Sequence, residues 1–150
     1  MTPTTNIILD DRLLLDYLLE MPTKELRQAV QKRTVFTTGF WYYRLCHAVR
    51  SDTVTGALSG PFEKAERRVR ELASVALVEL PENVGLLSLR ELAPMMAEGV
   101  ERHRLNVMSL EALAAAMSLN AEIAMALGSE NLLLATAANA EGLKVRIVRV

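Results

Sequence analysis

The stretch TNIILDDRLLLDYLL (residues 5–19) joins a run of apolar, β-branched residues directly to two carboxylates and a leucine-rich segment. Asn6 to Leu9 predicts a short strand, and Asp11 to Leu19 predicts a helix with apolar residues on more than one side. Asp10 stands at the junction. A carboxylate there either belongs to a site at the end of a sheet or accepts hydrogen bonds from the first N–H groups of the helix as its N-cap. The sequence leaves both interpretations open.

The same alternation of strand and helix continues along the chain. Further strands are predicted at 34–37, 75–80, 121–126 and 143–150. Helices are predicted at 23–30, 40–49, 62–73, 86–104, 109–119 and 131–142, with Thr23 as an N-cap, Gly142 at the C′ position, and Pro94 and Gly99 bending or splitting the helix of 86–104. This rhythm predicts an α/β fold of three layers, α/β/α, with a central, mainly parallel sheet of about five strands. Ligands of such sheets gather at the carboxyl ends of the strands.

Composition limits the classes of protein to which the chain can belong. With 150 residues, 51% of them apolar and 23% charged, it is expected to form a single domain spanning residues 1–150. A net charge of -1 provides no overall attraction to nucleic acid or to an anionic membrane. No apolar stretch is long enough to cross a bilayer and the first residues lack a secretory pattern, so we expect a cytoplasmic protein. The single cysteine, Cys46, excludes an intramolecular disulfide, and neither histidine has a second ligand at zinc spacing.

Three segments carry a resemblance to a known family. They are IILDDRLLLDYLL (7–19), VFTTGFWYYRL (35–45) and SLEALAAAMSLNAEIAMALGSENLLLATAANAEGLKVRIV (109–148). Together they resemble a PIN domain, the fold of many small Mg²⁺-dependent ribonucleases, including toxins of bacterial toxin-antitoxin pairs. The resemblance implies a PIN-like arrangement of the three layers and a Mg²⁺ or Mn²⁺ site built from acids at the ends of the strands.

The resemblance also assigns positions to those acids. The first falls on Asp10 and the third on Glu111, which precedes Ala112. The second falls on or near Arg44, which has the opposite charge, and the fourth falls around Asn131. The resemblance therefore implies a degenerate site, with Asp10 and Glu111 as candidate catalytic residues and with Asn131 beside them as a candidate metal ligand. We hypothesise that Arg44 partly replaces the metal by neutralising Asp10 and Glu111.

Each of these residues also has an ordinary structural interpretation. Glu111 would suit the positive end of the helix that it begins, and Asn131 would suit an N-cap. Arg44, on an aromatic helix, would suit stacking on a neighbouring ring. These interpretations stay open beside the site hypothesis.

Three functional hypotheses follow. The first is a PIN-like domain that has lost its nuclease activity and acts through binding, as a homodimer or with a protein or nucleic-acid partner. The second is an endoribonuclease in which Asp10, Glu111 and either Asp11 or Glu130 bind Mg²⁺ or Mn²⁺ and activate water. The third is an interaction protein whose α/β fold resembles the family by chance. Basic residues are interleaved with glutamates on the predicted helices, so charge does not support RNA binding.

Overall fold

A computed structural model of the chain describes residues 4–50 and 79–150. Its strands form one sheet in the order β3-β2-β1-β4-β5, and every pairing is parallel. The strands are β1 (Asn6–Leu9), β2 (Thr34–Thr37), β3 (Val84–Leu86), β4 (Glu122–Ala126) and β5 (Val145–Val148). The central strand is β1, in which Ile8 lies opposite Phe36 of β2 and Ile123 of β4. The predicted fold class is confirmed.

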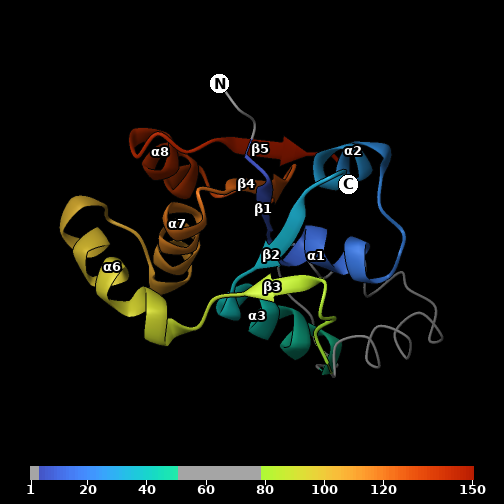
Figure 1. Ribbon diagram of the computed structural model, residues 1–150, viewed down its shortest axis with the longest axis horizontal. Coiled ribbons are helices and arrows are strands. Elements are labelled where there is room, and N and C mark those ends of the chain that lie inside the picture. Colours follow the sequence, from blue (N-terminus) through green and yellow to red (C-terminus); the bar gives the residue numbers. More distant parts are fainter. Residues whose placement is uncertain (1–3, 51–78) are drawn as a thin grey trace.

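Helices cover both faces of the sheet. Those described are α1 (Asp11–Leu18), α2 (Lys24–Val30), α3 (Gly39–Arg50), α6 (Leu89–Arg102), α7 (Val107–Leu119) and α8 (Leu132–Ala140). Successive strand residues point to opposite faces, so Ile7 and Leu9 pack with α1, α2 and α3, whereas Ile8 packs with α6, α7 and α8. Figure 1 shows these two groups of helices on either side of the sheet. No helix within the described ranges is long and apolar enough to span a membrane.

Several helix ends lie where the sequence predicts them. The Thr23 hydroxyl accepts a hydrogen bond from the Leu26 N–H at 3.2 Å and caps α2. At the end of α8, Gly142 adopts a φ of +77°, which lets the Leu143 N–H reach the carbonyl of Ala138 at 2.9 Å. Glycine is favoured there because a side chain strains this left-handed conformation. Both predictions are confirmed.

The third strand is the main difference from the sequence prediction. The structure forms it at Val84–Leu86, which was predicted as a turn followed by a helix. Only three residues long and centred on Gly85, it shows no alternation of apolar and polar residues. The strand predicted at 75–80 lies mostly outside the described residues, and its last two residues, Glu79 and Leu80, are not in a strand. The helix predicted at 62–73 lies outside the described residues entirely.

Of the two predicted effects of Pro94 and Gly99, bending or splitting the helix, the splitting does not occur. Residues 89–102 form the single helix α6, which contains Pro94 and begins three residues later than predicted. Buried Leu92 and Gly99 hold α6 against its neighbours, and a Cβ atom at Gly99 would lie 3.0 Å from the Leu110 side chain of α7. This packing compensates for the backbone hydrogen bond that proline cannot donate.

Candidate functional site

A cavity of about 540 Å³ opens beyond the carboxyl ends of β1 and β4. These two strands are neighbours, but the chain leaves β1 toward β2 on one side and leaves β4 toward β5 on the other. Such a switch point is where open α/β sheets bind their ligands. Among the described residues, the polar ones that line the cavity are Asp10, Asp11, Arg44, Ser109, Ser129, Glu130 and Asn131. The predicted residues Asp10, Arg44 and Asn131 are therefore brought together, whereas Glu111 is not among the lining residues.

Asp10 is buried and uses both carboxylate oxygens within the fold. Oδ1 accepts a hydrogen bond from the Leu13 N–H at 2.8 Å, and Oδ2 accepts one from the Ala126 N–H at 2.9 Å. The first caps α1, and the second ties the end of β1 to the end of β4. Burial raises the pKa of Asp10 to about 7, against the lowering effect of these two N–H groups. The N-cap interpretation of Asp10 is confirmed.

Arg44 reaches the cavity from α3, but its ion-pair partner is Asp11. Its Nε lies 3.2 Å from Oδ2 of Asp11, and its Nη1 lies 3.7 Å from the sulfur of Met108. Within the described residues, no ion pair joins Arg44 to Asp10 or to Glu111, so our hypothesis about its partners was wrong. The reason is local, because Asp10 turns back onto the backbone as a cap while Asp11, one residue later, faces α3.

The Asp11 carboxylate is poorly solvated as well as paired. Its Oδ1 accepts a hydrogen bond from the Arg12 N–H at 2.9 Å, whereas the buried Oδ2 has the ion pair but no aligned hydrogen bond. Burial raises the pKa of Asp11, and the Arg44 guanidinium lowers it. Arg44 therefore compensates for part of the cost of burying this acid.

Glu111 is also buried, but it serves the start of α3. Its Oε1 accepts a hydrogen bond from the Phe40 N–H at 2.8 Å, and a Cβ atom at Gly39 would lie 3.0 Å from Oε2. Asn106 caps α7, so this helix begins two residues earlier than predicted and Glu111 lies beyond its first turn. The carboxylate thus faces the positive end of α3 and not that of its own helix.

Two polar residues of this region were missed from the sequence. Thr38 accepts a hydrogen bond from the Trp41 N–H at 3.1 Å and caps α3, and a threonine ahead of a helical run is a recognisable signal. The Ser109 hydroxyl accepts a hydrogen bond from Nδ2 of Asn131 at 2.8 Å. That contact joins α7 to the residue before α8, and no local sequence pattern predicts it.

Asn131 is an N-cap, as its ordinary interpretation proposed. Its Oδ1 accepts a hydrogen bond from the Leu134 N–H at 3.0 Å, while its Nδ2 contacts Ser109. The amide oxygen is the atom with which an asparagine would bind a hard cation, and here it caps α8. A metal ion would have to compete with the helix for this oxygen.

The arrangement does not fit a divalent metal ion. Mg²⁺ and Mn²⁺ need several oxygen ligands that converge and remain available. Asp10 and Asn131 direct their oxygens to backbone N–H groups, and the Asp11 carboxylate is paired with a guanidinium. Across residues 4–50 and 79–150, no group of three or more histidine, cysteine, aspartate or glutamate side chains is placed to hold a metal ion.

Comparisons with known protein families and with curated proteins identify no relative of the chain. Neither the models of known protein families nor the curated proteins give a significant match to the chain.

Proposed function

We propose that the chain is a PIN-like domain without nuclease activity that acts by binding a protein partner at the carboxyl-end cavity. The observation that carries the proposal is the state of Asp10, the first acid of the resemblance. Both of its oxygens accept backbone hydrogen bonds, from Leu13 and Ala126, and the residue is buried. An acid that holds the strand ends and α1 together has a structural task that is sufficient to explain its presence.

The rim of the cavity supports a protein partner. Leu132 and Leu133, in the first turn of α8, line the cavity and are 71% and 68% exposed. Adjacent large apolar side chains beside a cavity are typical of protein interfaces. Arg44, the one cation among the described lining residues of the cavity, is already paired with Asp11, so it offers little charge to an RNA phosphate.

One observation favours the ribonuclease as a second candidate. Asp10, Asp11 and Glu130 all line the same cavity. A rearrangement that released Asp11 from Arg44 would leave more than one carboxylate facing one space. The two candidates make opposite predictions about hydrolysis.

Hydrolysis is tested with the full chain, an unstructured RNA and either Mg²⁺ or Mn²⁺. The double variant Asp11→Asn/Glu130→Gln removes two carboxylates and keeps Asp10, which the fold needs. We expect the unmodified chain and the double variant to leave the RNA equally intact. Cleavage by the unmodified chain that the double variant loses would establish the ribonuclease instead.

Partner binding is tested by changing the rim. Leu132→Ser/Leu133→Ser removes the apolar rim, and Val100→Ser changes an apolar residue of α6 with a similar exposed fraction as a control. We expect a protein cross-linked to the chain in extracts of its own cells to be lost with the rim variant and kept with Val100→Ser. Equal capture by both variants would contradict the proposed surface, and a self-crosslink would identify a second copy as the partner.

A further inference from the structure

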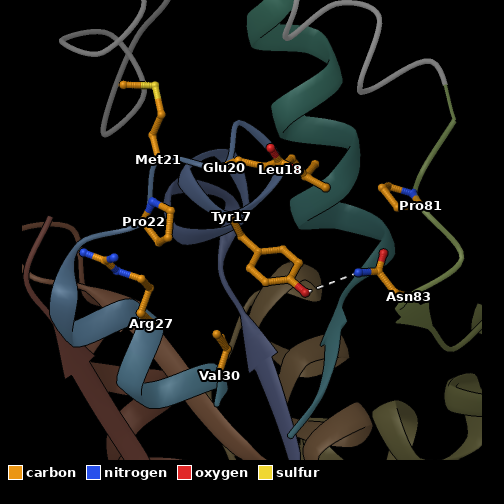
Figure 2. A pocket seen from close by; sticks show the side chains of 9 residues that line it. All are labelled: Tyr17, Leu18, Glu20, Met21, Pro22, Arg27, Val30, Pro81 and Asn83. Carbon is orange, nitrogen blue, oxygen red and sulfur yellow. Dashed lines mark hydrogen bonds between the residues drawn. The ribbon is translucent and has the colours of Figure 1, made fainter. Parts of the chain in front are cut away.

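A second cavity, of about 730 Å³, lies on a different set of residues. It is lined by the end of α1, the α1–α2 connection and α2, and by Pro81 and Asn83, which precede β3 (Figure 2). It shares no described lining residue with the carboxyl-end cavity. Its volume lies within the range of roughly 300 to 1,000 Å³ that is usual for small-molecule sites.

The cavity has an apolar wall with a positioned aromatic ring. Leu18, Pro22 and Val30 line it, and the Tyr17 ring lies between Pro22 and Asn83 in the view of Figure 2. The Tyr17 hydroxyl accepts a hydrogen bond from Nδ2 of Asn83 at 3.4 Å, and no acceptor within residues 4–50 and 79–150 takes its own O–H proton. Such a wall suits an apolar group of a ligand.

Two opposite charges border this wall. Glu20 and Arg27 both line the cavity, and no ion pair or hydrogen bond of either side chain exists within the described residues. Other charged side chains of the same helices form ion pairs, Arg12 with Asp16 and Glu25 with Arg149, whereas Lys24 of α2 has none within the described residues and does not line the cavity. Glu20 and Arg27 are thus the two charged side chains among the described lining residues of this cavity, and both are exposed to a ligand there.

The backbone at Glu20 is a further observation. Glu20 has a φ of +55° at the end of α1, where the Met21 N–H reaches the carbonyl of Asp16 at 3.0 Å. Glycine would adopt this conformation at a lower cost, by about 1 kcal/mol. The turn therefore does not explain why a carboxylate stands at this position.

We propose that this cavity binds a small zwitterion with an apolar body, of the class of a free α-amino acid with a large apolar side chain or a dipeptide of such residues. Arg27 binds the carboxylate, Glu20 binds the ammonium group, and the wall around Tyr17 takes the apolar side chain. Glu20 and Arg27 both gain a partner only when the ligand carries a positive and a negative charge. The inference is independent of the proposed function, since it concerns other residues.

The test is titration of the full chain with L-phenylalanine, the dipeptide L-leucyl-L-phenylalanine and N-acetyl-L-phenylalanine amide, followed by NMR of the amide signals. The last compound keeps the apolar body and lacks both charges. We expect saturable binding of the free amino acid or the dipeptide, with shifts at Tyr17 and Val30, and binding of the uncharged compound that is at least about tenfold weaker. The tighter binding of either L-phenylalanine or the dipeptide shows whether the cavity prefers a free amino acid or a dipeptide.

Variants check which charges act. Arg27→Gln and Glu20→Gln should each weaken binding by about tenfold, whereas Arg90→Gln and Glu91→Gln, which change exposed residues of α6, should leave it unchanged. The inference is overturned if neither zwitterion saturates at about 10 mM. It is also overturned if the uncharged compound binds equally well, or if the α6 variants weaken binding as much as those at the cavity.

Discussion

At the scale of the residue, Asp10 is a buried carboxylate whose protonation should govern the response of the fold to pH. Burial raises its pKa from 3.8 to about 7. Between these values the folded chain holds a proton that the unfolded chain releases. The free energy of unfolding should therefore fall as pH rises through this window, by about 1.4 kcal/mol for each unit of the shift.

Urea unfolding at about pH 5 and about pH 8 tests this prediction. We expect the unmodified chain to be more stable at the lower pH. The variant Asp10→Asn should be less stable than the unmodified chain, because its amide N–H₂ meets a backbone donor, and it should lose much of the pH dependence. A stability of the unmodified chain that rises over this range would contradict the proposed state of Asp10.

Arg44 should stabilise the fold through Asp11. In Arg44→Met the buried Asp11 carboxylate loses its cation, so the free energy of unfolding should fall. We expect a decrease of about 1–2 kcal/mol, which is less than for a fully buried ion pair, because Arg44 itself is partly exposed. The loss should shrink when Asp11→Asn is added, since the neutral amide needs no counter-charge. Arg90→Met on α6 is the control. Equal costs for Arg44→Met and Arg90→Met in urea unfolding would exclude the ion pair as a source of stability.

At the scale of the element, Gly85 determines how β3 joins the sheet. A Cβ atom at this position would lie 2.5 Å from Cδ1 of Phe36 on β2. Gly85→Ala should therefore displace the ring or the strand, at a cost of about 1–3 kcal/mol. Phe36→Leu in the same chain should recover part of that loss, as a thermal melt of both variants would show. A melting temperature unchanged by Gly85→Ala would mean that β3 does not pack on Phe36.

The helices and strands differ in how well their local sequences predict them. The strands β1 and β4 and the helices α1 and α8 were predicted because their apolar runs meet clear caps at Asp10, Asn131 and Gly142. The strand β3 was not predicted, because the reason for its glycine, Gly85, is the close approach of the Phe36 ring on β2, which the local sequence does not show. The start of α7 was misplaced because Ser109, which looks like a cap, bonds to Asn131 while Asn106 caps the helix.

At the scale of the whole molecule, the alternation of strands and helices predicted the parallel sheet, but not the partners of the acids. Strand order places Asp10 and Asn131 around one cavity, as expected for residues at the ends of β1 and β4. The contacts of Arg44 with Asp11 and of Glu111 with Phe40 depend on how α3 and α7 pack, across separations that no local pattern encodes. Proximity was therefore easier to predict than pairing.

The central claim is that the acids at the carboxyl ends of the strands hold the fold together and do not bind a metal ion. Calorimetric titration of the full chain with Mn²⁺ tests it most directly, with Asp11→Asn/Glu130→Gln as the matched variant. We predict no saturable heat up to about 1 mM Mn²⁺ for either protein. Saturable binding by the unmodified chain that the double variant loses would contradict the claim.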